Sequence, residues 1–100
     1  MIRHIVFWKL KETAEGHTAA ENAAKIVKAF AALEGQIEGL ETIDSGADFN
    51  RTGQAWDLAL ITTFKTADAL NYYQNHPKHQ EIVKFILKVV TARAVVDYNF

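Results

Sequence analysis

The amino-acid sequence predicts an α+β fold whose elements follow the order β-α-β-β-α-β. Four segments alternate apolar and polar residues with the period of a strand, and two segments repeat apolar residues at helical spacing. The only proline, Pro77, interrupts the second helical segment. This order is that of the ferredoxin-like split βαβ arrangement, with four strands in one antiparallel sheet. With 100 residues, the chain is expected to form a single domain over residues 1–100.

Strand character is found in four segments, which are residues 2–10, 40–49, 55–65 and 91–100. In the third segment, Trp56, Leu58 and Leu60 share one face and Ile61 lies on the other. The loop at residues 50–54 has turn chemistry, so the second and third strands are expected to form an antiparallel hairpin.

Helix boundaries are marked by capping residues. Thr18-Ala19-Ala20-Glu21 fits a capping box that starts the first helix, and Gly35 is predicted to end it. Thr66 is the predicted cap of the second helical region. Within that region, Pro77 donates no backbone hydrogen bond and moves His76 out of helical conformations. We therefore expect one helix to end near His76 and another to start at about Pro77.

Composition excludes several classes of function. The formal net charge is −1 with no run of like charge, which argues against nucleic-acid and membrane-surface partners. No apolar stretch reaches the roughly 18 residues of a membrane span, and the charged amino-terminal strand is unlike a signal peptide. The chain has no cysteine, so disulfides, thiolate nucleophiles and cysteine metal sites are excluded. A cytoplasmic location is expected.

Apolar residues lie on both faces of the predicted sheet. Val6 and Trp8 share one face of the first strand, while Ile5 and Phe7 share the other. The helices of one domain cover only one face of such a sheet, so the second face needs another cover. The sequence therefore predicts a homodimer formed through the sheet faces.

Several segments together resemble the stress-responsive A/B barrel (Dabb) family of the dimeric α/β-barrel superfamily. They are Ile2-Arg3-His4-Ile5-Val6-Phe7-Trp8-Lys9-Leu10-Lys11, Ile37-Glu38-Gly39-Leu40, Ser45-Gly46-Ala47-Asp48, Trp56-Asp57-Leu58-Ala59-Leu60 with Phe64, Tyr73-x-x-His76-Pro77-x-His79, and Val96-Asp97-Tyr98. The resemblance covers nearly the whole chain. It implies a ferredoxin-like subunit that dimerises through its sheet.

The resemblance also implies a site. The best-understood enzymatic relative is the plant cyclase that forms olivetolic acid by an intramolecular aldol closure, without metal or cofactor. Its catalytic tyrosine and histidine correspond to Tyr73 and His79, and a strand histidine that lines its cavity corresponds to His4. The superfamily also includes cofactor-free monooxygenases, and many bacterial Dabb proteins have no assigned activity.

The residue types are consistent with proton transfer beside a carbonyl group. A neutral imidazole at His79 can take a proton near neutral pH, and the Tyr73 phenol can donate to an oxygen that gains charge. The structural alternative is that His79 caps the new helix and Tyr73 is core. His76 is expected to hold the joint with Pro77, and His17 to face solvent.

An apolar pocket is predicted around these groups, lined by Val6, Trp8, Phe30, Leu58, Leu60 and Ile82. Each of these side chains also fits an ordinary core position. No metal is expected, because the proline break separates His76 from His79 and no carboxylate has clear ligand spacing.

The leading interpretation is a homodimer that performs cofactor-free acid/base chemistry on a small apolar, aromatic or polyketide-like carbonyl compound. Two alternatives stay open. One is a non-catalytic ligand-binding or structural dimer, and the other is a cofactor-free monooxygenase.

Overall fold

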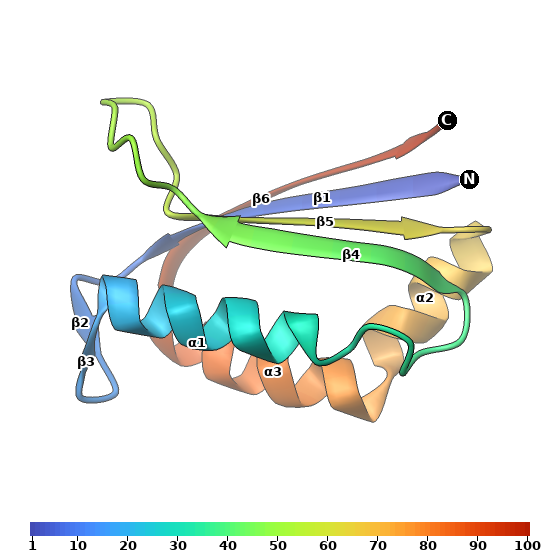
Figure 1. Cartoon of the computed structure of the whole chain (residues 1–100), viewed down its shortest axis with the longest axis horizontal. Coiled ribbons are helices and arrows are strands. Elements are labelled where there is room, and N and C mark those ends of the chain that lie inside the picture. Colours follow the sequence, from blue (N-terminus) through green and yellow to red (C-terminus); the bar gives the residue numbers. More distant parts are fainter.

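A four-stranded antiparallel sheet with the strand order β4-β5-β1-β6 forms one layer of the computed structural model, which describes residues 1–100. Three helices lie together against one face of this sheet, and the other face is open (Figure 1). The elements are β1 (Ile2–Leu10), β2 (Thr13–Ala14), β3 (His17–Thr18), α1 (Ala19–Ala31), β4 (Leu40–Ala47), β5 (Leu58–Phe64), α2 (Ala67–Asn75), α3 (Pro77–Val89) and β6 (Val90–Asn99). The predicted ferredoxin-like fold is therefore confirmed. None of the helices has the length and apolar character needed to cross a membrane.

The register of the sheet fixes which side chains share a face. In the centre, Val6 of β1 lies opposite Leu60 of β5 and Val95 of β6. Val6 and Leu60 are buried beneath the helices, and Trp8 stacks on Phe30 of α1 with ring centroids 5.9 Å apart. Burial of these large apolar groups on the helical side supplies the main driving force for folding.

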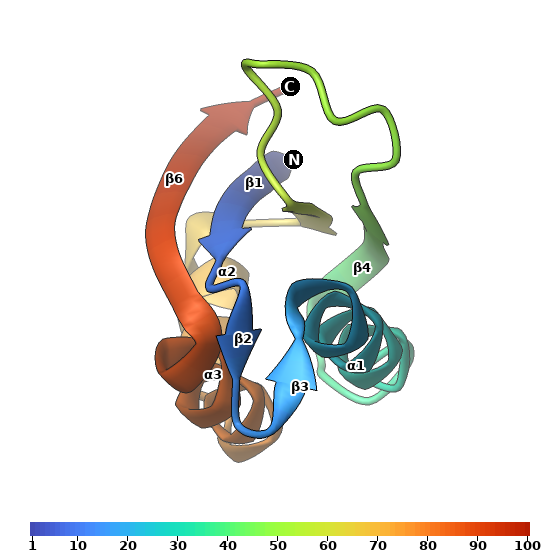
Figure 2. The same ribbon diagram turned by 90° about the vertical axis from the view of Figure 1, so that its left-hand side faces the viewer.

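A short hairpin, β2–β3, stands where the sequence predicted only a polar connection (Figure 2). Its two central residues, Glu15 and Gly16, have φ values of 53° and 79°. Positive φ at both central positions is characteristic of the type I′ turn, whose twist suits a two-residue hairpin.

The capping box at the start of α1 is confirmed. The Glu21 N–H donates to Thr18 Oγ1 over 3.2 Å, and the Thr18 N–H donates to Glu21 Oε1 over 2.9 Å. These bonds to Thr18 lower the pKa of the Glu21 carboxyl. The helix ends at Ala31, before Gly35, because the following turns tighten: the Leu33 N–H donates to the Phe30 carbonyl.

The second helical region is divided at Pro77, as predicted. His76 has extended backbone angles (φ −68°, ψ 136°) and caps both helices. Its N–H donates to the Tyr73 carbonyl at the end of α2 over 3.1 Å, and its Nδ1 accepts from the Lys78 N–H at the start of α3 over 3.1 Å. The joint therefore satisfies backbone groups that the break leaves free.

The loop between β4 and β5 is longer than predicted, because β5 begins at Leu58 and leaves Trp56 outside the strand. Asp57 organises this loop: its carboxylate accepts from the Leu10 N–H over 2.7 Å and from Arg51 over 2.6 Å. Burial raises the pKa of the Asp57 carboxyl, but these two donors outweigh that effect and hold the pKa below its usual range.

Candidate functional site

A cavity of about 580 Å³ lies between the helical face of β1 and β6 and the helix α3. Of the residues predicted from the sequence, its walls contain His4, Val6, Trp8, Phe30, Leu60 and His79. The remaining predicted side chains, Leu58, Ile82 and Tyr73, are buried but contribute no wall. The cavity is mostly apolar, with a few polar groups drawn from β1, α2, α3 and β6.

His79, in the first turn of α3, presents a basic nitrogen. Its Nδ1 lies 3.1 Å from the Gln74 carbonyl oxygen, which can only accept, so Nδ1 carries the proton and Nε2 has the free lone pair. Burial lowers the pKa of His79 below its usual 6.5, the Gln74 bond acts in the opposite direction, and the nearby charges of His4 and Arg93 lower it further. His79 is therefore neutral at pH 7 and available as a base.

His4 is held in the same way by a carboxylate. It is only 3% exposed, and its Nδ1 donates to Asp97 Oδ1, directly across the β1–β6 pairing. The proton on Nδ1 leaves Nε2 as the free nitrogen of the neutral ring. The buried imidazole thus has a fixed orientation.

Tyr73 lies directly behind His79. Its ring is fully buried between Phe64, with centroids 5.1 Å apart, and His79, with centroids 4.3 Å apart. The hydroxyl is buried and has no hydrogen-bond partner. Burial raises the pKa of the Tyr73 phenol well above its usual 10. The group therefore remains a protonated donor at all ordinary pH values.

The family model described as the stress responsive A/B barrel domain (Dabb) matches residues 2–100 of this chain. The chain belongs to the Dabb family. An uncharacterised protein of Streptomyces coelicolor is 35% identical to it over 100 residues, which covers 100% of both chains.

Solved structures support the same Dabb fold. A dimeric ferredoxin-like protein of unknown function from Bacteroides fragilis is similar with a TM-score of 0.88 and 29% identity, covering 99% of this chain and 95% of that one. A hydroxynitrile lyase from Passiflora edulis has a TM-score of 0.78 and 18% identity, covering 97% and 90%. At that identity the second likeness concerns the fold alone.

Several polar residues of the Dabb cavity were missed from the sequence. Gln74, Gln80 and Arg93 line it, and Asp97 supports His4 from outside its walls. The alternation of β6 places Arg93 and Asp97 on one face, but only the β1–β6 register shows that this is the face of His4.

The other histidines lie elsewhere. His76 is occupied in the helix joint, and its ring meets the Tyr72 ring edge-on at 5.7 Å. His17 is half exposed in the β3 strand, 3.6 Å from Glu21. No group of three or more His, Cys, Asp or Glu side chains gathers in a way that would hold a metal ion.

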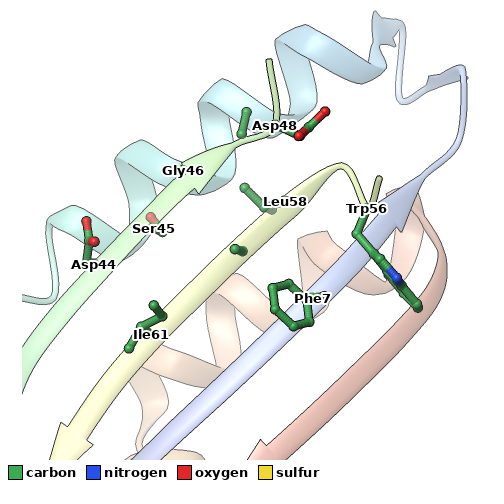
Figure 3. Close-up of a pocket in the computed structure, with 10 residues that line it drawn as sticks. Phe7, Asp44, Ser45, Gly46, Asp48, Trp56, Leu58 and Ile61 are labelled. Atoms are coloured by element: carbon green, nitrogen blue, oxygen red, sulfur yellow. The ribbon is translucent and has the colours of Figure 1, made fainter. Parts of the chain in front are cut away.

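A second hollow, of about 410 Å³, lies on the open face of the sheet. Figure 3 shows Phe7, Trp56 and Ile61 around it on the side away from the helices. It contains two aspartates at its edge, Asp44 and Asp48, and no histidine. This surface lacks a base that is neutral at pH 7, so it is a weaker candidate for proton chemistry than the cavity.

Proposed function

We propose that this Dabb chain transfers a proton at a carbon atom next to the carbonyl group of a small apolar, aromatic or ketide-like compound. The substrate lies in the cavity with the carbonyl near the two imidazoles. His79 Nε2 takes the proton from carbon, and the electron pair of that bond moves into the enolate. Return of the proton to another position, or attack of the enolate on a second carbonyl, completes an isomerisation or an aldol closure.

The observation that carries the proposal is the matched state of the two histidines. In each ring, Nδ1 donates to an acceptor of the protein: the Gln74 carbonyl for His79 and the Asp97 carboxylate for His4. Both rings line the same apolar cavity. One imidazole can therefore remove a proton while the other, once protonated, returns one to the product.

Tyr73 is assigned as the hydrogen-bond donor to the carbonyl oxygen. Its hydroxyl has no partner in the protein, and its ring packs against the ring of His79. A buried donor without a partner is costly unless a ligand supplies an acceptor. Because the Tyr73 hydroxyl is buried and contributes no wall to the cavity, this assignment requires the side chains around it to open when the substrate binds.

The test uses benzylacetone, a neutral aromatic ketone, and follows exchange of its α-protons for deuterium in D2O by NMR. We expect His79→Gln to slow the protein-dependent exchange by roughly 10²- to 10⁴-fold, the usual contribution of a positioned base. His17→Gln is the matched control, because that ring is half exposed and away from the cavity. If the α-protons exchange at the wild-type rate in His79→Gln, His79 is not the base.

A second candidate function is ligand binding without turnover. It is favoured by the position of Tyr73, whose hydroxyl lies outside the cavity walls. In that case benzylacetone binds and perturbs the NMR signals of cavity residues, while its α-protons exchange at the rate of the protein-free buffer.

We also propose that the chain forms a homodimer through the open face of its sheet. The relative from Bacteroides fragilis is dimeric. On this face Phe7 and Ile61, in the two central strands, are each 38% exposed, and Val96, on the edge strand β6, is 57% exposed. Large apolar side chains exposed together on one face indicate an interaction surface. A second copy that covers this face would bury about 800 Å² per subunit, the usual size of a stable interface.

A further inference from the structure

We propose that the cavity selects an anionic ligand, a carboxylate on a body of about one aromatic ring, and that Arg93 binds the carboxylate. This inference deepens the proposed function, since it names the substrate class of the same site. Arg93 lines the cavity from β6, where it lies opposite Trp8 on the helical face of the sheet. Arg93 is an exposed residue of this edge strand, at the border of a space whose other walls are mainly apolar.

Arg93 is the only one of the three arginines that has no partner. Arg3 donates to Tyr98 over 2.8 Å and lies over the Phe100 ring, and Arg51 is paired with Asp48 and Asp57. No ion pair or side-chain hydrogen bond involves Arg93. Its five N–H donors are therefore free to form the paired bonds that a carboxylate accepts.

The charge around the cavity has one sign. None of the residues that line it is an aspartate or a glutamate. Asp97, which accepts from His4, is not among the residues that line the cavity. The charge of Arg93 is felt inside the site, since it contributes to lowering the pKa of His79. A site with a free cation at its border, no carboxylate in its lining and apolar walls favours a ligand that has an apolar body and one negative charge.

The geometry also limits the size of the ligand. Arg93 and Asp97 are four residues apart on β6, and Asp97 is the partner of His4. Four strand residues span about 13 Å between Cα atoms. A ligand bound by Arg93 therefore needs a body beside its carboxylate in order to extend along β6 toward His4.

The experiment compares two probes of the same shape, 4-butylbenzoate and the neutral 4-butylbenzamide, by isothermal titration calorimetry at low salt. We expect the wild-type protein to bind the benzoate about tenfold or more tightly than the benzamide, and Arg93→Gln to bring this ratio to about one. Arg93→Lys should restore part of the preference, because it keeps the charge but loses the paired geometry. Lys84→Gln is the control, because it removes one positive charge from α3 at a residue that does not line the cavity.

Three results would overturn the inference: equal affinities in the wild-type protein, a ratio that Arg93→Gln leaves unchanged, or failure of both probes to bind at millimolar concentration. The proposed function is judged separately, because benzylacetone is uncharged. Exchange that is lost in His79→Gln but kept in Arg93→Gln supports the base and confines Arg93 to recognition. If the wild-type protein exchanges benzylacetone protons but shows no preference for the benzoate, only the inference about the carboxylate and Arg93 is refuted.

Discussion

Tyr73→Phe is expected to raise the stability of the protein and to lower its activity, because the Tyr73 hydroxyl has no hydrogen-bond partner in the fold. The substitution removes a single oxygen atom that is fully buried and forms no hydrogen bond. A polar group in that state costs about 1–3 kcal/mol of folding free energy. The phenylalanine ring keeps the contacts with Phe64 and His79, at centroid distances of 5.1 and 4.3 Å. We therefore expect Tyr73→Phe to be more stable by about 1 kcal/mol.

The stability is measured by thermal unfolding at one fixed protomer concentration, because association links the midpoint to concentration. For a domain of this size, about 1 kcal/mol raises the midpoint by roughly 4–8 °C. Tyr72→Phe is the matched control: it removes the same atom from the neighbouring residue, whose side chain is 53% exposed, and should change stability by less than about 0.5 kcal/mol.

Activity should fall in the same Tyr73→Phe protein. If the hydroxyl donates to the carbonyl oxygen of the substrate, its loss slows benzylacetone exchange about tenfold or more. The reasoning is refuted if Tyr73→Phe is less stable than the wild-type protein by more than about 1 kcal/mol, since the hydroxyl would then have a bonding partner. If Tyr73→Phe is more stable but exchanges benzylacetone protons at the wild-type rate, the hydroxyl is buried without a partner, as described, but takes no part in the reaction.

Three further changes test other parts of the structure. Gly39→Ala should lower the free energy of unfolding in chemical denaturation by about 1–3 kcal/mol, because Gly39 has φ +87° and an added β-carbon would lie 2.7 Å from a side chain of α2. Gly53→Ala is the control and should be near neutral, because the space around Gly53 is open. Equal losses in the two variants would contradict this reasoning. If the chain dimerises through this sheet face as proposed, Ile61→Asp should yield the 11.2 kDa monomer in sedimentation, whereas Tyr72→Asp on the helical side should not. The pKa of His79 is lowered in the folded protein, so folding favours the neutral ring. Activity, and the contribution of His79 to the free energy of unfolding, should therefore be complete above pH 6.5. Both should be lost as the pH falls through the pKa that His79 has in the folded protein. A pH–rate profile whose midpoint lies above 6.5 would contradict the assigned environment of this ring.

The fold was predictable because its signals are local. The capping box of Thr18 and Glu21 and the break at Pro77 each depend on residues only a few positions apart, and the alternation within each strand needs no knowledge of its neighbours. Two errors, the β2–β3 hairpin and the early end of α1, lie in local segments, whereas a third occurred where a distant partner decides a boundary. β5 starts late because the Asp57 carboxylate bonds to the Leu10 N–H on another strand, which no local pattern reveals.

The candidate site was predictable only in part, for the same reason. His4 and His79 were expected near one another through the family resemblance, and both line the cavity. Asp97 and Arg93 were not assigned to the site, because their relation to His4 depends on how β6 is aligned with β1. A shift of one residue in that register would turn both side chains to the open face of the sheet.

Pro77 links the helix break to the chemistry of the cavity. In a continuous helix the Lys78 N–H would donate to the carbonyl of Gln74, four residues earlier. Here the Lys78 N–H donates to His76 Nδ1 instead, so the Gln74 carbonyl has no backbone donor and accepts from side chains, one of which is Gln80 Nε2. That carbonyl accepts from His79 Nδ1 over 3.1 Å and so fixes the ring with Nε2 unprotonated. The break therefore does more than change the direction of the chain, because it supplies the acceptor that makes His79 a base.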